Sequence, residues 1–224
     1  VDQMVRIIQY LKTLPVKTIS IPKVEADDVI AYLSKSVITH PKDKSFIVSS
    51  DKDFLQLVDE NVVVYRPMEK EYYTPQTVID KYKLSPHNFI LHKTLLGDNS
   101  DKIKGVKGLG EKGLLKKFPE LIEKDMSWGD ILNICEEKIS EHLVYARIIH
   151  GRDDLEKNYK IMDLSNPMLS KEDKIWLDEI VASDNLPYYP DQFVSMYNED
   201  QIGGLIRNVE FWVKDCFNNL VIKK

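Results

Sequence analysis

The 224-residue sequence has little cysteine, no long apolar run and no excess of positive charge. Its two cysteines, Cys135 and Cys216, lack CxxC spacing, which excludes a disulfide scaffold or a zinc module, and we expect both to be buried reduced thiols. No apolar run approaches the about 18 residues of a membrane span, and VDQMVRIIQY lacks a basic region followed by an apolar core. We therefore expect no signal peptide, no membrane partner and a location in the cytoplasm.

The net charge of −5, from 31 basic and 36 acidic residues, argues by itself against a nucleic-acid-binding protein, whose usual electrostatic footprint is a basic patch. Net charge, however, hides how the charges are distributed along the chain. With 43% hydrophobic and 30% charged residues, the composition is typical of a globular protein with one large domain or two small ones.

Apolar spacing predicts helices that alternate with strands in the first third of the chain. Helices are expected where Met4, Ile7, Ile8 and Leu11 recur, and at VEADDVIAYLSKSVI and DKDFLQLV. Strands are expected at residues 17–21, 45–50 and 61–67, with EKEYYT at the sheet edge. This alternation predicts an α/β fold, a mostly parallel sheet covered by helices on both faces.

The pattern changes at Thr74 and Pro75, a typical cap and first position of a helix, and is helical from there to the C-terminus. We therefore predict a boundary near residue 74, with an α/β core at 1–74 and a helical region at 75–224.

Carboxylates gather at three places in the sequence. Two groups follow predicted strands, and because ligands bind outside the carboxyl ends of parallel strands, both groups should face one crevice. Such acids repel one another unless a cation neutralises them, and oxygen ligands without histidine or cysteine favour Mg²⁺ or Mn²⁺. Two such ions about 4 Å apart support phosphodiester hydrolysis. The predicted ligands are Glu25, Asp27, Asp28, Asp51, Asp53, Asp98 and Asp101.

Each acidic group also has an ordinary structural interpretation. Acids after a strand are common helix caps or partners of the helix dipole, and GDNSD could be an Asx-turn. An EF-hand is excluded, because a loop starting at Asp98 would place Lys102 and Ile103 where an acceptor and a glycine are needed.

The stretch GLGEKG matches the dinucleotide-binding pattern GxGxxG, but DKIKGVK precedes it where that pattern needs a buried strand. The same residues are compatible with two short helices joined by a glycine hairpin, at about residues 86–118. Its lysines are either a solvated face or a clamp that holds consecutive phosphates of one strand. The candidate nucleic-acid ligands are Lys102, Lys104, Gly105, Lys107, Gly108, Gly110, Lys112 and Lys116.

Taken in order, VEADDVIAYLSK, IVSSDKDFLQLV and LLGDNSDKIKGVKGLGEKG resemble the acidic motifs and helix-hairpin-helix of the 5′ nuclease family. This family includes the 5′-to-3′ exonuclease domain of bacterial DNA polymerase I, flap endonucleases and the ribonuclease H of T-even-like phages. The small size and divergent helical tail favour the phage ribonuclease H group, with the host cytoplasm as location. The resemblance covers roughly residues 1–120 and implies a PIN-like nuclease core.

The resemblance also implies roles for the residues. Glu25, Asp27 and Asp28, with Asp51, would hold one metal ion directly or through water, and the second ion would be held by Asp53, Asp98 and Asp101. The hairpin at Gly105, Gly108 and Gly110 would grip duplex phosphates, with K⁺ as a further cofactor bound by its carbonyls.

The sequence departs from the family in several respects. Members begin with a strand that bears a metal-binding Asp, followed by a second Asp and a basic helical arch, and we find no counterpart here. We therefore expect an N-terminally incomplete core whose missing segment belongs to a larger protein. Lys102 and Lys104 replace a common Asn and Pro, Gly113 replaces Thr or Ser, and the tail from about residue 125 matches no motif.

These features predict a structure-dependent 5′-to-3′ nuclease with Mg²⁺ or Mn²⁺ at two sites. It would act on duplex DNA with a 5′ flap or an RNA primer in replication or primer removal, with a single-strand-binding protein or other replication factor as a candidate partner. A non-catalytic helix-hairpin-helix module is the main alternative, but it has no use for acids that repel phosphate. A small PIN-type ribonuclease would keep the acids but would not usually carry the hairpin.

Overall fold

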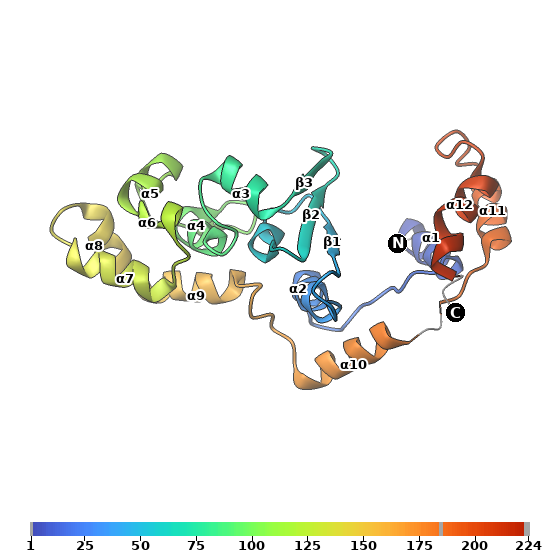
Figure 1. The fold of residues 1–224 in the computed structure, drawn as a ribbon, viewed down its shortest axis with the longest axis horizontal. Helices are drawn as coiled ribbons and strands as arrows, with labels where there is room; N and C mark the ends of the chain where they lie inside the picture. The colour runs from blue at the N-terminus through green and yellow to red at the C-terminus, as the bar shows by residue number, and fades with distance from the viewer. Residues whose placement is uncertain (1, 184–185, 222–224) are drawn as a thin grey trace. The chain divides into compact units, whose positions relative to one another are not determined.

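The computed structural model describes residues 2–183 and 186–221 and divides the chain into two compact units (Figure 1). The central unit comprises Val24–Leu169, and the terminal unit combines Val1–Lys23 with Ser170–Lys224. The compact units thus do not divide near residue 74, although the helical character of the chain does increase from there. None of the described helices has the length and apolarity needed to cross a bilayer.

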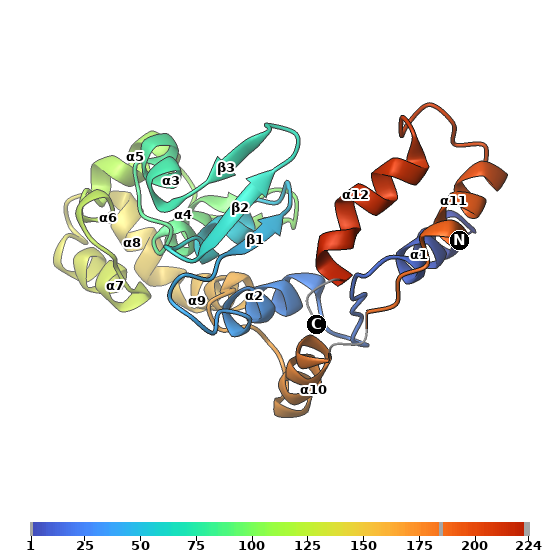
Figure 2. The same ribbon diagram turned by 45° about the vertical axis from the view of Figure 1, so that its right-hand side comes forward.

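The central unit contains a small mixed sheet. β1 (Ser45–Val48) pairs in parallel with β2 (Val62–Arg66), and β3 (Glu71–Tyr73) pairs antiparallel with β2 (Figure 2). Helix α2 (Ala26–Ser36) packs against β1, and the 3-10 helix η1 (Asp53–Leu57) follows β1 after a short turn. The short parallel connection therefore carries the chain from the carboxyl end of β1 directly into the acidic segment at Asp53.

Only one face of this sheet is covered. Ile47, Val62 and Val64 are buried against residues of α2 and η1. On the opposite face Phe46, Val48 and Tyr72 are 57%, 67% and 56% exposed. The expectation of helices on both faces is therefore wrong for the described residues, because α2 and η1 both pack on the same side.

Helices make up most of the remainder of the central unit. Thr74 caps α3 (Pro75–Tyr82) by accepting a hydrogen bond from the Thr77 N–H, as the Thr-Pro pair predicts. The chain then forms α4 (Phe89–Leu96), the short antiparallel strands β4 (Gly97–Asp98) and β5 (Ile103–Lys104), α5 (Glu111–Lys117), α6 (Glu120–Glu123), α7 (Trp128–Glu137), α8 (Leu143–His150) and α9 (Arg152–Met162).

A second core holds these helices together. Most of its buried members come from α4, α5, α7, α8 and α9, and they include Leu91, Leu114, Ile131, Ile148 and Leu155. Helix α4 is apolar around most of its circumference and packs extensively against α9, so it is buried on more than one side. Helices α7, α8 and α9, which follow residue 125 and match no motif, thus pack in one core with α4 and α5.

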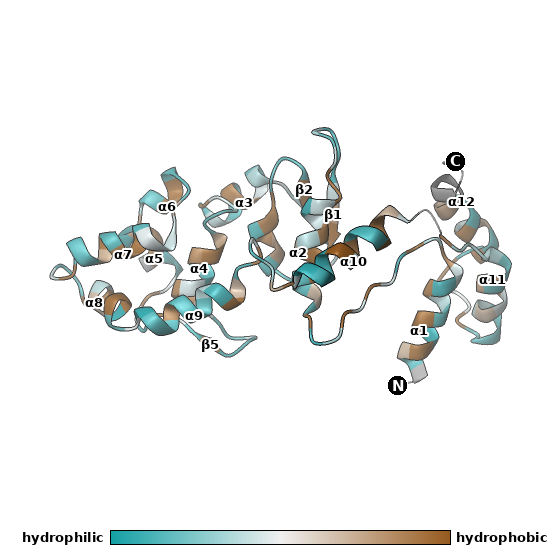
Figure 3. Ribbon diagram, turned by 90° about the horizontal axis from the view of Figure 1, so that it is seen from below, coloured by the Kyte–Doolittle hydropathy of each residue, from teal (hydrophilic) through white to brown (hydrophobic). Residues whose placement is uncertain are grey.

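The terminal unit consists of α1 (Asp2–Thr13), α10 (Lys171–Ala182), α11 (Pro190–Glu199) and α12 (Val209–Val221). Its core contains Leu14, Phe193, Tyr197 and Val213, and Arg6 of α1 binds Asp200 at 2.7 Å. Hydrophobic residues nevertheless lie along α1 (Figure 3), where Met4 is 64% exposed. The helical spacing of α1 is confirmed, although much of its apolar side is not buried.

Three other expectations need correction. Residues 17–21 form no strand, because no described segment pairs with them; instead the Lys17 ammonium binds the backbone carbonyls of Val181 and Ser183. Strands β4 and β5 interrupt the region expected to be wholly helical. Cys135 is buried as predicted, but Cys216 is exposed, so the expectation of two buried thiols holds for only one of them.

Candidate functional site

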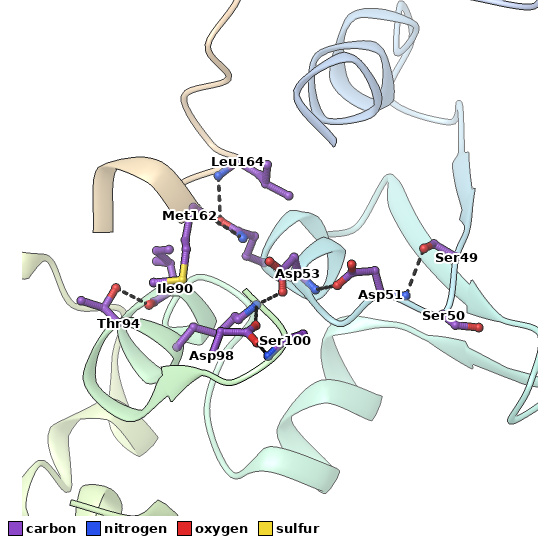
Figure 4. A network of polar contacts seen from close by, with 12 residues as sticks. Ser49, Ser50, Asp51, Asp53, Ile90, Thr94, Asp98, Ser100, Met162 and Leu164 are labelled. Carbon is purple, nitrogen blue, oxygen red and sulfur yellow. Dashed lines mark hydrogen bonds and ion pairs between the residues drawn. The ribbon is translucent and has the colours of Figure 1, made fainter. Parts of the chain in front are cut away.

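Three carboxylates from two separate segments meet in the central unit. Asp53 begins η1, Asp98 ends β4, and Asp101 lies in the turn between β4 and β5. One oxygen from each lies within 4.8 Å of the others. Figure 4 shows the Asp53 and Asp98 side chains close together. The structure thus brings together the three acids that the resemblance assigns to one metal ion.

A buried lysine stands between two of these acids. The Lys93 Nζ lies 2.6 Å from Asp98 Oδ2 and also forms an ion pair with Asp53 Oδ1. Only 9% of the Lys93 side chain is exposed. Lys93, together with hydrogen bonds from Ser100, holds the pKa of Asp98 well below its usual range. The Lys93 ammonium is therefore a cation within the acidic site. It binds carboxylate oxygens that could also coordinate a metal ion.

Backbone hydrogen bonds fix the orientation of the acids. Asp51 Oδ1 accepts a hydrogen bond from the Asp53 N–H at 2.9 Å, and Asp98 Oδ1 accepts one from the Ser100 N–H at 2.8 Å (Figure 4). These are the Asx-type contacts that the sequence also allowed. They do not exclude ligand binding, because a carboxylate oxygen can accept more than one contact: Asp98 Oδ2 pairs with Lys93 while Oδ1 binds Ser100.

The three acids at the start of α2 differ in their contacts and in their electrostatic surroundings. Glu25 precedes the first turn without capping it by its side chain, and Asp28 Oδ1 accepts a hydrogen bond from the Met168 N–H at 2.9 Å. Burial raises the pKa of Asp27, and the charges of Asp51, Glu25, Asp28 and Asp101 raise it further. Asp27 thus responds electrostatically to acids of both predicted groups, whereas Asp28 is engaged by the segment that follows α9.

A cavity of about 480 Å³ opens beside the three-carboxylate cluster. Its lining includes the segments 50–53 and 97–100, with Lys93 and Arg66 as its buried cations. Arg66 Nη2 donates to the Ser50 carbonyl at 2.7 Å, while its buried Nε has no partner among the described residues. The cavity therefore offers carboxylate oxygens and positive charge side by side, a suitable environment for cations and an anionic substrate together.

Each glycine of the predicted hairpin has a different structural environment, so glycine is needed at these positions to different degrees. A Cβ on Gly105 would lie 2.1 Å from the carbonyl carbon of Leu96, so glycine is needed for close backbone contact there. Gly108 has a φ of +82°, which favours glycine in the turn, and Gly110 precedes α5 with open space around it. The need for Gly105 thus follows from packing alone, without any nucleic acid.

The lysines around this hairpin are free of acidic partners. Lys102, Lys104, Lys107, Lys112 and Lys116 are all exposed, and none forms an ion pair with another described residue. Lys117 is half-buried with its ammonium 5.6 Å from the centre of the Tyr145 ring. Glu111 is the single acid in the sequence between residues 102 and 117. A local basic surface therefore exists despite the net charge of −5.

Sequence comparisons give the following relatives. The model of the family "5′-3′ exonuclease, N-terminal resolvase-like domain" matches residues 1–83. The chain is 35% identical over 173 residues to a 5′-3′ exonuclease of Aquifex aeolicus, covering 74% of this chain and 55% of that protein. It is 33% identical over 157 residues to the thermostable DNA polymerase I of Thermus thermophilus, covering 65% of this chain and 18% of the polymerase.

Solved structures of bacteriophage T5 proteins have a similar fold. A T5 5′-exonuclease with bound zinc ions gives a TM-score of 0.56 at 23% identity, covering 81% of this chain and 62% of that one. A T5 flap endonuclease in a pseudo-enzyme-product complex with DNA and metal ions gives a TM-score of 0.56 at 21% identity, with the same shares covered. The chain spans about half the length of the Aquifex exonuclease, 55%, and less than two thirds of these T5 chains.

Proposed function

Because the chain belongs to the 5′ nuclease family, we propose that it carries metal-binding and nucleic-acid-binding parts of a 5′-to-3′ nuclease. This nuclease hydrolyses phosphodiesters of a 5′ flap or RNA primer on duplex DNA. The observation that carries the proposal is the convergence of Asp53, Asp98 and Asp101 around Lys93. These three acids, brought together from two distant segments, would repel one another there unless cations were part of the site.

The donor set fits a hard divalent cation, Mg²⁺ or Mn²⁺. Carboxylate oxygens are the ligands these ions prefer, and the Lys93 ammonium supports the fit because it already binds two of the three acids. Asp53, Asp98 and Asp101 would hold one ion, and Glu25, Asp27, Asp28 and Asp51 would contribute to a second, as the family resemblance implies. Such a pair of ions activates water and stabilises the leaving oxygen in phosphodiester hydrolysis.

The chain's own residues would orient the substrate. The unpaired hairpin lysines attract backbone phosphates without reading bases, and Arg66 and Lys93 supply positive charge in the cavity beside the acids. A T5 flap endonuclease of similar fold has been solved as a complex with DNA and metal ions, which supports a nucleic-acid substrate. In this proposal residues 86–118 form a helix-hairpin-helix. Its carbonyls bind either K⁺, as the resemblance implies, or a cationic side chain of the chain itself.

The biological setting is a proposal of the same kind. We place the nuclease in replication or primer removal in the cytoplasm, near the phage ribonuclease H group, with a replication factor such as a single-strand-binding protein as partner. Preference for an RNA primer over a DNA flap would sharpen this assignment, and the two substrates can be compared directly in one cleavage assay.

Replacing Asp101 with Asn tests the metal site, because Asp101 is the exposed member of the cluster and its loss should leave the fold intact. Mg²⁺ should raise the melting temperature of the wild type by mass action, and this shift should shrink in the variant. Cleavage of a 5′-flap duplex should fall at least about tenfold, which corresponds to about 1.4 kcal/mol.

The matched control is Asp153→Asn, an exposed acid of α9 outside the site. It should keep both the Mg²⁺ shift and the cleavage rate. Cleavage that persists unchanged in EDTA would contradict the metal assignment. Duplex binding by a wild type that Mg²⁺ does not stabilise would instead favour the non-catalytic DNA-binding alternative.

A further inference from the structure

Two side chains of α8 and α9 hold the backbone of the glycine hairpin, residues 105–110, and of Lys104 directly before it. Arg147 of α8 donates from Nη1 to the Lys107 carbonyl at 2.7 Å. Asn158 of α9 donates from Nδ2 to the Lys104 carbonyl at 3.3 Å. Carbonyls of a tight exposed turn would otherwise be left to water or to a bound cation.

Arg147 also fits closely against the turn itself. A Cβ built on Gly108 would lie 3.0 Å from Arg147 Nη1, so the missing side chain at position 108 leaves room for the guanidinium. Gly108 is favoured by its φ of +82°, and the guanidinium end of Arg147 lies beside the space that a side chain there would take. Arg147 forms no ion pair with any described residue, which leaves its charge for the hairpin.

Helix α8 is a firm support for this contact. Val144 and Ile148 are buried in the same core as Leu109 and Leu114, which belong to the hairpin and α5. The Tyr145 hydroxyl donates to the Lys117 carbonyl at 3.1 Å, at the end of α5. One short helix therefore contacts both ends of the segment that runs from the hairpin through α5.

We propose that Arg147 is a positioning residue that holds the glycine hairpin in its phosphate-gripping conformation and replaces a hairpin-bound monovalent cation. The guanidinium supplies the positive charge and the hydrogen bond that such a cation would give to the Lys107 carbonyl. Because Arg is always charged, it also disfavours a second cation beside it. The proposal rests on the proposed nucleic-acid binding of the hairpin and gives a function to the helices that match no motif.

The test replaces Arg147 with Met and measures affinity for a short 5′-flap duplex in Ca²⁺. We expect binding to weaken about tenfold, with the slope of log affinity against log salt unchanged, because Arg147 acts through the hairpin and not on phosphate. Arg147→Lys should recover most of the loss, since an ammonium can still donate to the Lys107 carbonyl. A slope shallower by about 0.9 would show direct phosphate contact and overturn the positioning function.

Exchange of K⁺ for Li⁺ at constant ionic strength gives an independent result. Wild-type affinity should be the same in both salts if Arg147 takes the place of the cation. Marked loss of wild-type binding in Li⁺ would show that the hairpin needs bound K⁺ and would overturn the proposal.

Amide hydrogen exchange in the free protein separates this inference from the proposed function. The amides of residues 106–110 should exchange faster in Arg147→Met than in the wild type. Arg152→Met, a control at an exposed residue of α9, should leave their exchange rates unchanged. Unchanged exchange would overturn the bracing by Arg147 whatever the DNA result. If the wild type fails to bind duplex DNA while exchange responds as expected, the proposed function fails and the bracing stands.

Discussion

The acidic cluster and the glycine hairpin are adjacent in sequence, yet the charges of the first are paired within the chain and those of the second are not. The acids have partners within the chain: Lys93 pairs with Asp53 and Asp98, and backbone N–H groups bind Asp28 and Asp51. The hairpin lysines are exposed and have no acidic partner among the described residues. Charges that are already paired respond to a competing cation, whereas unpaired surface charges respond to salt and to an external polyanion. The difference predicts that each region can be altered without the other.

Gly105 links the hairpin to the acidic cluster, so replacing it should disturb both regions. Its replacement should cause the largest loss of stability among the variants considered. It is the first glycine of the hairpin and contacts the backbone of Leu96 and Gly97, directly before Asp98. Gly105→Ala places a Cβ 2.1 Å from a backbone carbon, which must shift. We expect the free energy of unfolding to fall by about 4 kcal/mol or more, measured by urea denaturation.

Gly110→Ala is the matched control, because a Cβ there meets nothing within 4 Å. It should change stability by no more than about 0.5 kcal/mol. In Gly105→Ala both the Mg²⁺-induced stabilisation and duplex binding should decline together. Equal stability of the two variants would show that the backbone contact at Gly105 is not needed.

Lys93→Met isolates the acidic region. Without the ammonium, the half-buried carboxylates of Asp53 and Asp98 face one another unneutralised, so the metal-free protein should lose about 2–3 kcal/mol of stability. Adding Mg²⁺ should recover more stability in this variant than in the wild type, because the ion replaces a missing charge. Thermal melts with and without Mg²⁺ measure both effects.

An exposed lysine provides the control for this change. Lys124→Met should leave the melting temperature and its Mg²⁺ response as in the wild type. A Lys93→Met protein as stable as the wild type in EDTA would mean that the carboxylates do not need the lysine. The duplex salt dependence of Lys93→Met should stay unchanged, because the buried Lys93 is already paired with Asp53 and Asp98 and releases no counterion when DNA binds, and the hairpin lysines are intact.

Part of this arrangement follows from sequence and part does not. Acids after a strand and acids three residues apart in GDNSD predict a shared site, and the structure does bring Asp53, Asp98 and Asp101 together. The parallel pairing of β1 with β2 follows from their apolar alternation with a helix between them. Residues 17–21 show the limit: β-branched residues favour extended backbone, but a strand forms only where another segment pairs with it.

The side chains that the sequence analysis missed act over long separations. Lys93 lies in the apolar run FILHKTLL, where a buried lysine requires a nearby acid, and this was the available signal. Arg147 and Asn158 lie 40 and 54 residues from their hairpin partners, and their acceptors are backbone carbonyls that carry no residue identity. No sequence pattern records such a pairing, so only the folded chain reveals it.

The smallest effect is expected from two hairpin lysines, Lys107 and Lys112, changed together to Ala. Both are exposed and unpaired, so stability should hardly change. Each lysine that neutralises a phosphate releases counterions, so the slope of log affinity against log salt on duplex DNA should become shallower by up to about two units. The loss should be similar on unrelated sequences because phosphate contacts carry no base information. Mg²⁺-induced stabilisation should remain as in the wild type, in contrast to Asp101→Asn, in which it should shrink.

The control for the lysine pair changes Lys12 and Lys214, exposed residues of the terminal unit, to Ala. This protein loses the same two charges from its total, so any effect of net charge alone appears in both variants. If both variants shift the salt slope equally, the hairpin lysines are only a solvated face. If only the hairpin pair shifts the slope, while Lys93→Met does not, then the hairpin lysines bind phosphate and the acidic cluster does not. The acidic cluster would then be left as the region that binds cations.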